Sequence, residues 1–264
     1  MTGLDTDDFL SLVNGGVRIS NAVPIIESAW TVKTEDELTI YRHIGEQYAR
    51  TMQVSRESIH PGVTENQLSA TVTAAWYDTG GEGLLQINVC AGEDMNPWRR
   101  WPSQRAIADG EFVGIDLHGR SYAGLHGDAT RTYFVGDHPT PEQRDLYRRA
   151  YDYIKAMTSV IEAGLSIAEI CERAPRIPDE YREALWDLNL AHAIGPGASG
   201  EPRLDPRKPR KDVVLEPNQV LSVECYFGQK GSPLAVKLED DIIVRDGPPE
   251  LLGPTMPYDE RFIG

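Results

Sequence analysis

The sequence has few of the features that mark secreted, disulfide-stapled or membrane-spanning proteins. Its three cysteines, Cys90, Cys171 and Cys225, are widely separated, which argues against a disulfide framework and against a zinc knuckle. The acidic start MTGLDTDDFLSLVN has no basic stretch followed by an apolar core, and no apolar run approaches the length of a bilayer span. These absences predict a cytoplasmic protein that does not bind membranes.

Basic residues are scarce as well. The 264 residues include 26 Lys and Arg against 41 Asp and Glu, which gives a formal net charge of −15. Such a charge disfavours nonspecific binding to nucleic acid phosphates and to anionic lipids, so we expect no nucleic acid partner. The surplus acids are candidates for holding cations instead.

Four helix starts are predicted from capping boxes, in which Ser or Thr is followed three residues later by Glu or Gln. The pairs are Thr34/Glu37, Thr64/Gln67, Thr140/Gln143 and Ser166/Glu169. We expect the first helix to end near Ser58, the second near Tyr77 and the third, which has Pro141 in its first turn, near Ala163.

Five runs rich in β-branched and aromatic residues are predicted strands. They are LLQINVC, EFVGIDLHG, RTYFVG, VLSVECYFG and LAVKLEDDIIV. Because helices and strands are grouped along the chain, an α+β fold with a mainly antiparallel sheet is favoured over a doubly wound parallel sheet. The stretch GEPRLDPRKPRKD, rich in proline and charge, is predicted to be an exposed loop.

Acidic residues interrupt the most apolar of these runs. Asp116, Asp128, Glu224 and Glu239 all lie in or beside predicted strands, where an unpaired buried carboxylate is costly. Any one of them alone is expected on a solvated face or in an ion pair. Together with His192, in the glycine-rich stretch LAHAIGPGASGEP, they have the charge and donor types that suit two divalent cations such as Mn, Fe, Co or Zn.

These motifs resemble the metal-ligand motifs of the pita-bread metallohydrolases, which include methionine aminopeptidase, aminopeptidase P, prolidase and creatinase. The resemblance covers about Thr31 to Leu252 and implies an antiparallel curved sheet covered by helices. It implies that two metal ions are bound, with Asp116 on one metal, His192 and Glu224 on the other, and Asp128 and Glu239 bridging both. We also expect Thr130 to orient a ligand carboxylate and Arg131 to pair with an acid.

Two histidines that the peptidases of this family use around the substrate are absent. Ser199 stands at the position seven residues after the ligand histidine, and Trp98 and Arg99 stand where the other histidine is expected. Lys237 also replaces the arginine usual in prolidase-like members. Losing both histidines should weaken peptide hydrolysis, because they would stabilise charge in the transition state.

The departures resemble dimethylsulfoniopropionate lyases built on this fold, which share NPW, the longer gap between the two aspartates, and VKLE. The stretch NPWRRWPSQR predicts a zwitterion site, with an onium group facing tryptophan and a carboxylate held by arginine. The alternative is a surface turn. The substrate-binding candidates are Trp98, Arg99, Arg100, Trp101, Ser199 and Tyr122.

The lyases keep a catalytic Asp six residues after the ligand histidine, where this chain has Ala198. Another base is therefore needed, and Glu201 and Tyr226 are the candidates, beside a hydroxide held by the metals. His118, His126 and Tyr122 are expected on a strand face or in a turn.

The sequence therefore predicts a dinuclear-metal enzyme that acts on a small polar substrate by metal-hydroxide hydrolysis or by β-elimination. One alternative is an Xaa-Pro dipeptidase or aminopeptidase, and the other is a non-catalytic binding module on the same fold. We expect residues 1–30 to be the junction to, or remnant of, a missing N-terminal domain and residues 31–264 to be the catalytic domain. Relatives of this kind are commonly homodimers.

Overall fold

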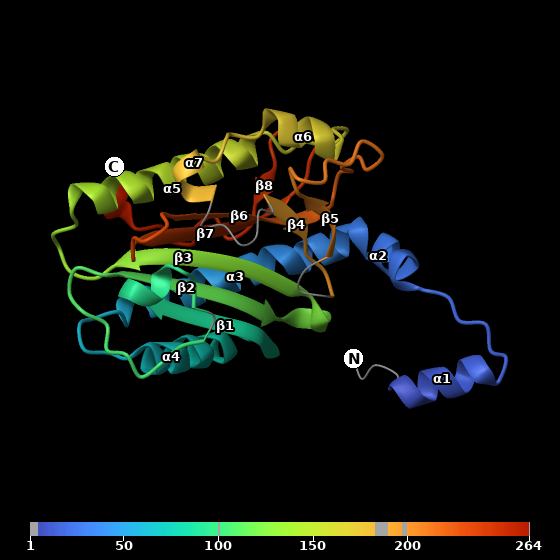
Figure 1. Cartoon of the computed structure of the whole chain (residues 1–264), viewed down its shortest axis with the longest axis horizontal. Helices are drawn as coiled ribbons and strands as arrows, with labels where there is room; N and C mark the ends of the chain where they lie inside the picture. The colour runs from blue at the N-terminus through green and yellow to red at the C-terminus, as the bar shows by residue number, and fades with distance from the viewer. Residues whose placement is uncertain (1–4, 100, 183–189, 197–199, 264) are drawn as a thin grey trace.

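A computed structural model describes residues 5–99, 101–182, 190–196 and 200–263 (Figure 1). The predicted site residues Arg100 and Ser199, together with Ala198, lie outside the described residues.

All four predicted helix starts are confirmed. Helices α3 (Glu35–Glu57), α4 (Glu65–Asp78), α5 (Pro141–Ser159) and α6 (Ile167–Arg173) each begin with a complete capping box. Helix α5 ends before the predicted Ala163, because the backbone beyond it bonds elsewhere: the amide of Ala163 donates to the Arg245 carbonyl and that of Gly164 to the Leu215 carbonyl. The other helices are α1 (Thr6–Asn14), α2 (Val23–Thr31), α7 (Asp179–Arg182), η1 (Gly92–Met95), η2 (Tyr122–Gly124) and η3 (Glu260–Phe262).

Eight strands form one sheet in the described part of the chain, and every neighbouring pair is antiparallel. The five predicted strands are β1 (Gly83–Ala91), β2 (Phe112–Arg120), β3 (His126–Phe134), β6 (Val220–Gly228) and β7 (Ala235–Ile243). The order across the sheet is β1-β2-β3-β7-β6-β4-β5, with β8 (Glu250–Leu251) paired to β7. The predicted α+β class and antiparallel sheet are confirmed.

The predicted loop at 200–212 is wrong in its first part. Gly200–Leu204 forms strand β5, which pairs with the three-residue strand β4 (Ala191–Ala193). Pro202 lies in this strand, a position that proline tolerates because β5 is at the edge of the sheet. The remainder, from Pro206 to Asp212, is exposed, as predicted.

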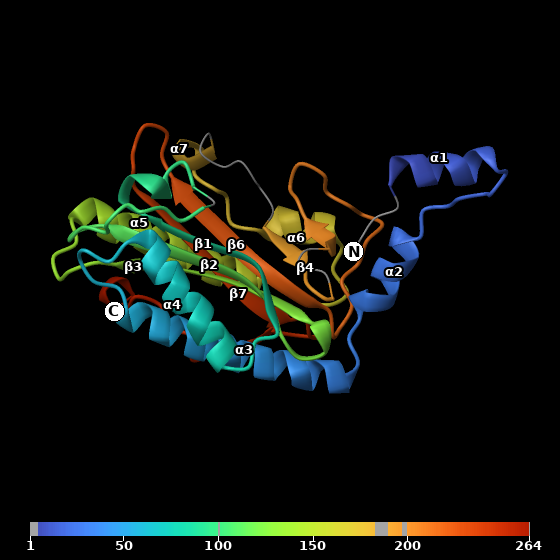
Figure 2. The ribbon, with the colours of Figure 1, turned by 90° about the horizontal axis from the view of Figure 1, so that it is seen from below.

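Helices cover the two halves of the sheet separately (Figure 2). Helix α3 packs on β3 and α4 on β1, whereas α5 packs on β6 and β7 and α6 on β5. Two apolar clusters result, one built around Tyr48, Trp76 and Ile115 and the other around Tyr147, Ile154 and Phe227. The centre of the sheet, between the two clusters, is left for polar groups.

The halves of the sheet meet at a seam between β3 and β7. These two strands share a single ladder pair, Thr130 with Glu239, in the described structure. On either side of that pair, hydrogen bonds from side chains link the two strands. The Thr132 hydroxyl donates to the Lys237 carbonyl (2.8 Å) and accepts from the Lys237 amide (3.1 Å). The Asp241 carboxylate likewise accepts from the amide of Asp128 (3.0 Å). The seam is thus held largely by polar side chains rather than by backbone pairing.

The N-terminal segment extends beyond the sheet: α1 lies apart from it (Figure 1), whereas α2 contacts β5. Neither α1 nor α2 contains a buried residue, and large apolar side chains such as Phe9, Val17 and Ile25 are exposed on it. Within the described residues, no helix is both long and apolar enough to cross a membrane.

Candidate metal centre

Strand register aligns the acidic residues in a row across the seam. Asp116 on β2 lies opposite Thr130 on β3, Thr130 lies opposite Glu239 on β7, and Glu239 lies opposite Glu224 on β6. Because alternate residues of a strand share a face, Asp128 projects from the same face as Thr130. The sequence places these residues far apart, and the antiparallel pairing brings them together.

His192 reaches the same row from β4. Its register partner is Ser222 on β6, two residues from Glu224 and so on the same face of the sheet. The ring is 5% exposed, and its Nε2 lies 3.7 Å from Asp128 Oδ2 and 3.8 Å from Glu239 Oε1. All five residues predicted as metal ligands thus lie on one face, although the ligation itself stays a prediction.

Donor atoms gather in two groups that share Asp128. In one group, Asp116, His118 and Asp128 each offer a donor atom, all within 4.8 Å of one another. Asp128, His192 and Glu239 form the second group by the same criterion. Two adjacent cations bridged by Asp128 would fit this arrangement.

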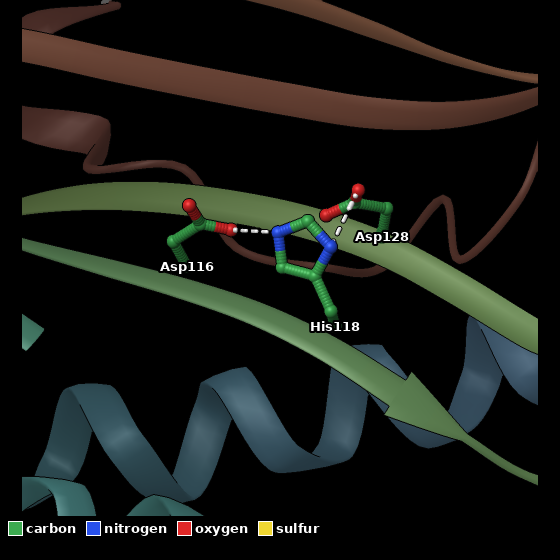
Figure 3. Close-up of side chains that lie close together, drawn as sticks. All are labelled: Asp116, His118 and Asp128. Atoms are coloured by element: carbon green, nitrogen blue, oxygen red, sulfur yellow. Dashed lines mark ion pairs between the residues drawn. The ribbon is translucent and has the colours of Figure 1, made fainter. Parts of the chain in front are cut away.

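His118 lies between the two aspartates of the first group (Figure 3). Its Nε2 is 3.2 Å from Asp116 Oδ1 and its Nδ1 is 2.9 Å from Asp128 Oδ2. The expectation that His118 is only a strand-face residue is therefore incomplete, because its ring faces the acids. The signal in the sequence was its spacing from Asp116, since residues two apart on a strand share a face.

Lys237 adds a positive charge to the cluster. Its ammonium nitrogen lies 2.9 Å from Glu239 Oε2, 3.2 Å from Asp116 Oδ2 and 3.4 Å from Glu224 Oε2. Four carboxylates carry a formal charge of −4 when ionised, and one lysine offsets only part of it. Lys237 thus links Glu224 to the other acids of the site.

Burial and neighbouring charges move the pKa values of these groups in different directions. Burial raises the pKa of Asp128 well above its ordinary value, and Glu239 raises it further. Burial would also raise the pKa of Asp116, but Lys237 and His118 outweigh that effect and hold it below its ordinary value. Burial lowers the pKa of His192 and so keeps its imidazole neutral, the form that binds metals.

The residues present fit a pair of divalent cations. Asp128 is fully buried, and among the described residues neither of its carboxylate oxygens, nor Asp116 Oδ1, has a partner with hydrogen-bond geometry. Buried oxygens without donors are costly unless a cation or proton compensates them. Carboxylate oxygens with imidazole nitrogens suit Mn, Fe, Co or Zn, which bind mixed oxygen and nitrogen ligands.

Neighbouring side chains hold the acids in place, as metal ligands require. The Thr130 hydroxyl donates to Glu239 Oε2 (2.7 Å) and the Ser222 hydroxyl to Glu239 Oε1 (3.0 Å). Asn88 donates to Asp116 Oδ2 (3.1 Å). The orienting contact predicted for Thr130 is confirmed.

Arg131 has the structural role that the sequence predicts. Its guanidinium donates to Asp240 Oδ1 (2.6 Å) and to the carbonyl of Glu239 (2.8 Å), and it is 1% exposed. The pairing with an acid is thus confirmed, and it fixes the backbone on which Glu239 stands.

Trp98 is a described substrate-binding candidate that contacts Lys237 of this cluster. Its ring centroid is 6.0 Å from the Lys237 ammonium, and the ring packs edge-on against Tyr226, with centroids 6.4 Å apart. It also lies over Gly114, where a Cβ atom would be 2.6 Å from the indole ring. The glycine therefore allows the indole to approach the sheet.

Tyr226, predicted as a possible base, has its hydroxyl engaged. The hydroxyl donates to the Met95 carbonyl (2.9 Å) and lies 3.0 Å from Asn96 Oδ1. Burial raises the pKa of this phenol, which keeps its proton in place. These contacts favour a structural role in which Tyr226 packs against Trp98. Catalysis by Tyr226 stays a prediction that its contacts do not support.

The remaining described candidates lie apart from the two donor groups. Arg99 pairs with Asp94 (3.3 Å) and is half-exposed, and Trp101 is 70% exposed. Tyr122 is exposed, with its hydroxyl over Gly80. Glu201 is exposed on β5 and lines a small pocket with Lys33 and Trp30. None of these four belongs to either donor group in the described chain, and their roles stay predictions.

Comparison with known proteins is consistent with this geometry. The model of metallopeptidase family M24 matches residues 39–246. A dimethylsulfoniopropionate lyase of Roseovarius nubinhibens is 26% identical over 260 residues, covering 94% of this chain. An Xaa-Pro dipeptidase of Lactobacillus delbrueckii subsp. lactis is 28% identical over 222 residues, covering 81% of this chain. The chain spans 57% of the first relative's length and 58% of the second's.

Solved structures support the fold. The Xaa-Pro dipeptidase from Bacillus anthracis superposes with a TM-score of 0.82 at 23% identity, covering 97% of this chain and 71% of that one. The prolidase from Pyrococcus furiosus superposes with a TM-score of 0.81 at 20% identity, covering 96% and 74%. The predicted pita-bread fold is confirmed.

Proposed function

Because this chain belongs to metallopeptidase family M24, we propose that it is a dinuclear-metal enzyme acting on a small polar substrate. We further propose β-elimination of the dimethylsulfoniopropionate lyase type, rather than peptide hydrolysis, as its reaction. The observation that carries this proposal is Trp98, which lies beside the donor groups at a position where the peptidases are expected to have a histidine.

Asp116, Asp128, His192, Glu224 and Glu239 would hold the two ions. When bound, two divalent cations would supply Lewis acidity that stabilises negative charge developing on a substrate carboxylate or carbonyl. The chain's own residues do the remaining work: they bind the substrate, orient it and move a proton.

The aromatic face of Trp98 supports binding of an onium substrate. The Trp98 ring, 7% exposed, already has the Lys237 ammonium 6.0 Å from its centroid. A sulfonium group is attracted to an aromatic face in the same way as an ammonium group. A histidine in place of Trp98 would supply a hydrogen-bond donor for a scissile carbonyl, whereas Trp98 supplies an extended aromatic face.

The elimination needs neither an oxidant nor a reductant. A base removes the proton from the carbon next to the carboxylate, and that electron pair forms a carbon–carbon double bond. The carbon–sulfur bond breaks, sulfur leaves with its electron pair as neutral dimethyl sulfide, and acrylate remains. Of the two side chains predicted as bases, beside a hydroxide held by the metals, we favour Glu201, because the Tyr226 hydroxyl donates to the Met95 carbonyl and burial raises the pKa of its phenol.

The test is a paired assay on protein loaded with Mn, Fe, Co or Zn. Release of dimethyl sulfide from dimethylsulfoniopropionate is measured by gas chromatography, and cleavage of Xaa-Pro dipeptides is measured on the same preparation. We expect dimethyl sulfide release that is lost in Asp128→Asn and kept in Asp145→Asn, an acid exposed on α5. Dipeptide cleavage without dimethyl sulfide release would overturn the lyase proposal.

The second candidate is an Xaa-Pro dipeptidase. It is favoured by the Lactobacillus relative, whose identity of 28% is slightly above that of the lyase. The substitution Trp98→His tests it directly, since that change restores one expected histidine. A rise in dipeptide cleavage in this variant, with no cleavage by the unchanged protein, would mean that the peptidase function has been lost from this chain.

A non-catalytic binding module on the same fold is the remaining alternative. It predicts that the purified protein contains no transition metal and gains no thermal stability when one is added. Two metal ions per chain, measured by elemental analysis, would exclude it.

A further inference from the structure

We propose that His118 is a metal ligand, so that each ion of the centre binds one imidazole. This inference rests on the proposed dinuclear centre, and it adds a sixth protein ligand to the five matched in the sequence. The juxtaposition that carries it is the ring of His118, held between Asp116 and Asp128 with one nitrogen facing each carboxylate (Figure 3).

The two donor groups have the same composition. Each combines Asp128, one further carboxylate and one imidazole, with His118 and Asp116 on one side and His192 and Glu239 on the other. His192 matches an expected ligand, and His118 stands in the equivalent relation to Asp128. The His118 side chain is 20% exposed.

The surroundings of Asp116 explain why a nitrogen donor is needed on this side. Its Oδ2 is already engaged by Asn88 (3.1 Å) and Lys237 (3.2 Å). Its Oδ1 faces His118 and has no partner with hydrogen-bond geometry in the described structure. An ion on this side would therefore meet few protein oxygens, and the imidazole of His118 would offer it a further donor.

Burial lowers the pKa of the His118 imidazole, but Asp128 and Asp116 outweigh that effect and raise it, so a bound cation would displace a proton from the ring. One ring nitrogen would then offer its lone pair to the cation and the other would keep its N–H, the usual arrangement of metal-binding histidines. Strand pairing fixes the ring in this place, because His118 lies directly opposite Asp128 in the β2–β3 register.

A second imidazole changes which metals the centre prefers. Oxygen-only sites suit Mg, Ca and Mn, whereas imidazole suits Fe, Co and Zn. We therefore expect the ion beside Asp116 to be held more tightly as Co²⁺ or Zn²⁺ than as Mn²⁺. The variant His118→Gln, which offers an amide oxygen in place of the ring nitrogen, should lose that preference.

Proton NMR of the Co²⁺-loaded protein tests the assignment without an activity assay. Each ligating imidazole with an exchangeable N–H gives one strongly shifted resonance, so we expect two in the unchanged protein and one in His118→Gln. The control is His126→Gln, since His126 is also buried on β3 but belongs to neither donor group of the described residues. It should keep both resonances.

Metal titration gives the second measurement. We expect two Co²⁺ per chain in the unchanged protein, and at least about tenfold weaker binding of one of them in His118→Ala. A single shifted resonance in the unchanged protein, or equal affinities in both proteins, would overturn the role of His118 while leaving the dinuclear centre intact. Failure of the unchanged protein to bind any metal would overturn both proposals. The resonance count in the unchanged protein decides the matter even if a variant fails to fold.

Discussion

The ammonium of Lys237 lies 2.9 Å from a carboxylate oxygen of Glu239, two residues along the same strand. In the absence of metal this lysine places a positive charge within 3.4 Å of carboxylate oxygens of Asp116, Glu224 and Glu239. Lys237→Met should therefore destabilise the metal-free protein by about 3–5 kcal/mol, the usual cost of leaving buried charges unpaired.

Adding Co²⁺ should recover most of that loss, because the ions replace the missing charge. The measurement is thermal unfolding in the presence of a chelator and then of Co²⁺, with Lys237→Arg as the control that keeps the charge. Identical melting of Lys237→Met and the unchanged protein in chelator would show that Lys237 does not balance the acids.

Substituting Gly114 tests the position of Trp98. A Cβ atom at this residue would meet the indole ring at 2.6 Å and the Met95 sulfur at 3.1 Å, so Gly114→Ala must displace the ring. We expect KM for the small polar substrate to rise about tenfold or more, a loss of roughly 1.4 kcal/mol of binding, while metal content stays at two ions per chain. Trp98→Ala should reproduce the effect; unchanged KM in both variants would remove Trp98 from substrate binding.

The pair of Arg131 and Asp240 is a structural support whose loss should be costly. Both side chains are 1% exposed, and the guanidinium also lies over the Tyr258 ring, 4.0 Å from its centroid. Arg131→Met should lower the free energy of unfolding by about 3–5 kcal/mol, because it leaves a buried carboxylate without its partner. In the double variant Arg131→Met/Asp240→Leu, which removes both charges, urea unfolding should show partial recovery; a strictly additive loss would argue against the pairing.

Glu250 provides a pH test that is remote from the metal ligands. It bonds Arg42 and Arg245, and these contacts lower its pKa from the ordinary value of 4.5 to about 2. A depressed carboxyl pKa stabilises the fold above pH 4.5, and the contribution is lost as the pH falls from 4.5 towards 2.

Glu250→Gln should accordingly be less stable than the unchanged protein at pH 7. Because the side chain is one-third exposed, with a fraction of 34%, we expect only about 1 kcal/mol after solvent screening. Denaturant unfolding at several pH values should show the difference shrinking as the medium is acidified below 4.5. A difference that is constant with pH would contradict the linkage.

Removing residues 1–20 should leave the fold of the remaining described residues unaffected. No described residue in that stretch is buried, so little packing is lost with it. We expect the melting temperature and the metal stoichiometry to match those of the full chain. A large drop in the melting temperature or in the metal stoichiometry would mean that α1 makes packing contacts that the single chain does not show.

Much of the fold could be predicted because its signals are local. Each capping box fixes a helix start through contacts within one turn, and alternation marks the five long strands. Strand β4 and strand β8 have only three and two residues, too few for a periodic pattern. The end of α5 depends on backbone partners far along the chain, so local sequence could not place it.

The site residues likewise divide into those that sequence motifs identify and those whose contacts depend on the folded chain. Sequence motifs identify the acids and His192, but the contacts of His118 follow from its register opposite Asp128, which only the paired strands define. Its spacing from Asp116 was a usable signal that a strand face would carry both. Trp98 reaches the cluster through a turn whose path the sequence does not specify, and Trp101, three residues later, points to solvent instead.

The seam between β3 and β7 has a consequence for motion. With a single ladder pair, Thr130 with Glu239, little backbone bonding resists separation of the two halves. Ions held between Asp128 on one side and Glu239 on the other would fasten them together, so metal occupancy should slow amide hydrogen exchange along both strands. Metal binding would then control how often the two halves of the sheet separate, as well as the chemistry at the site.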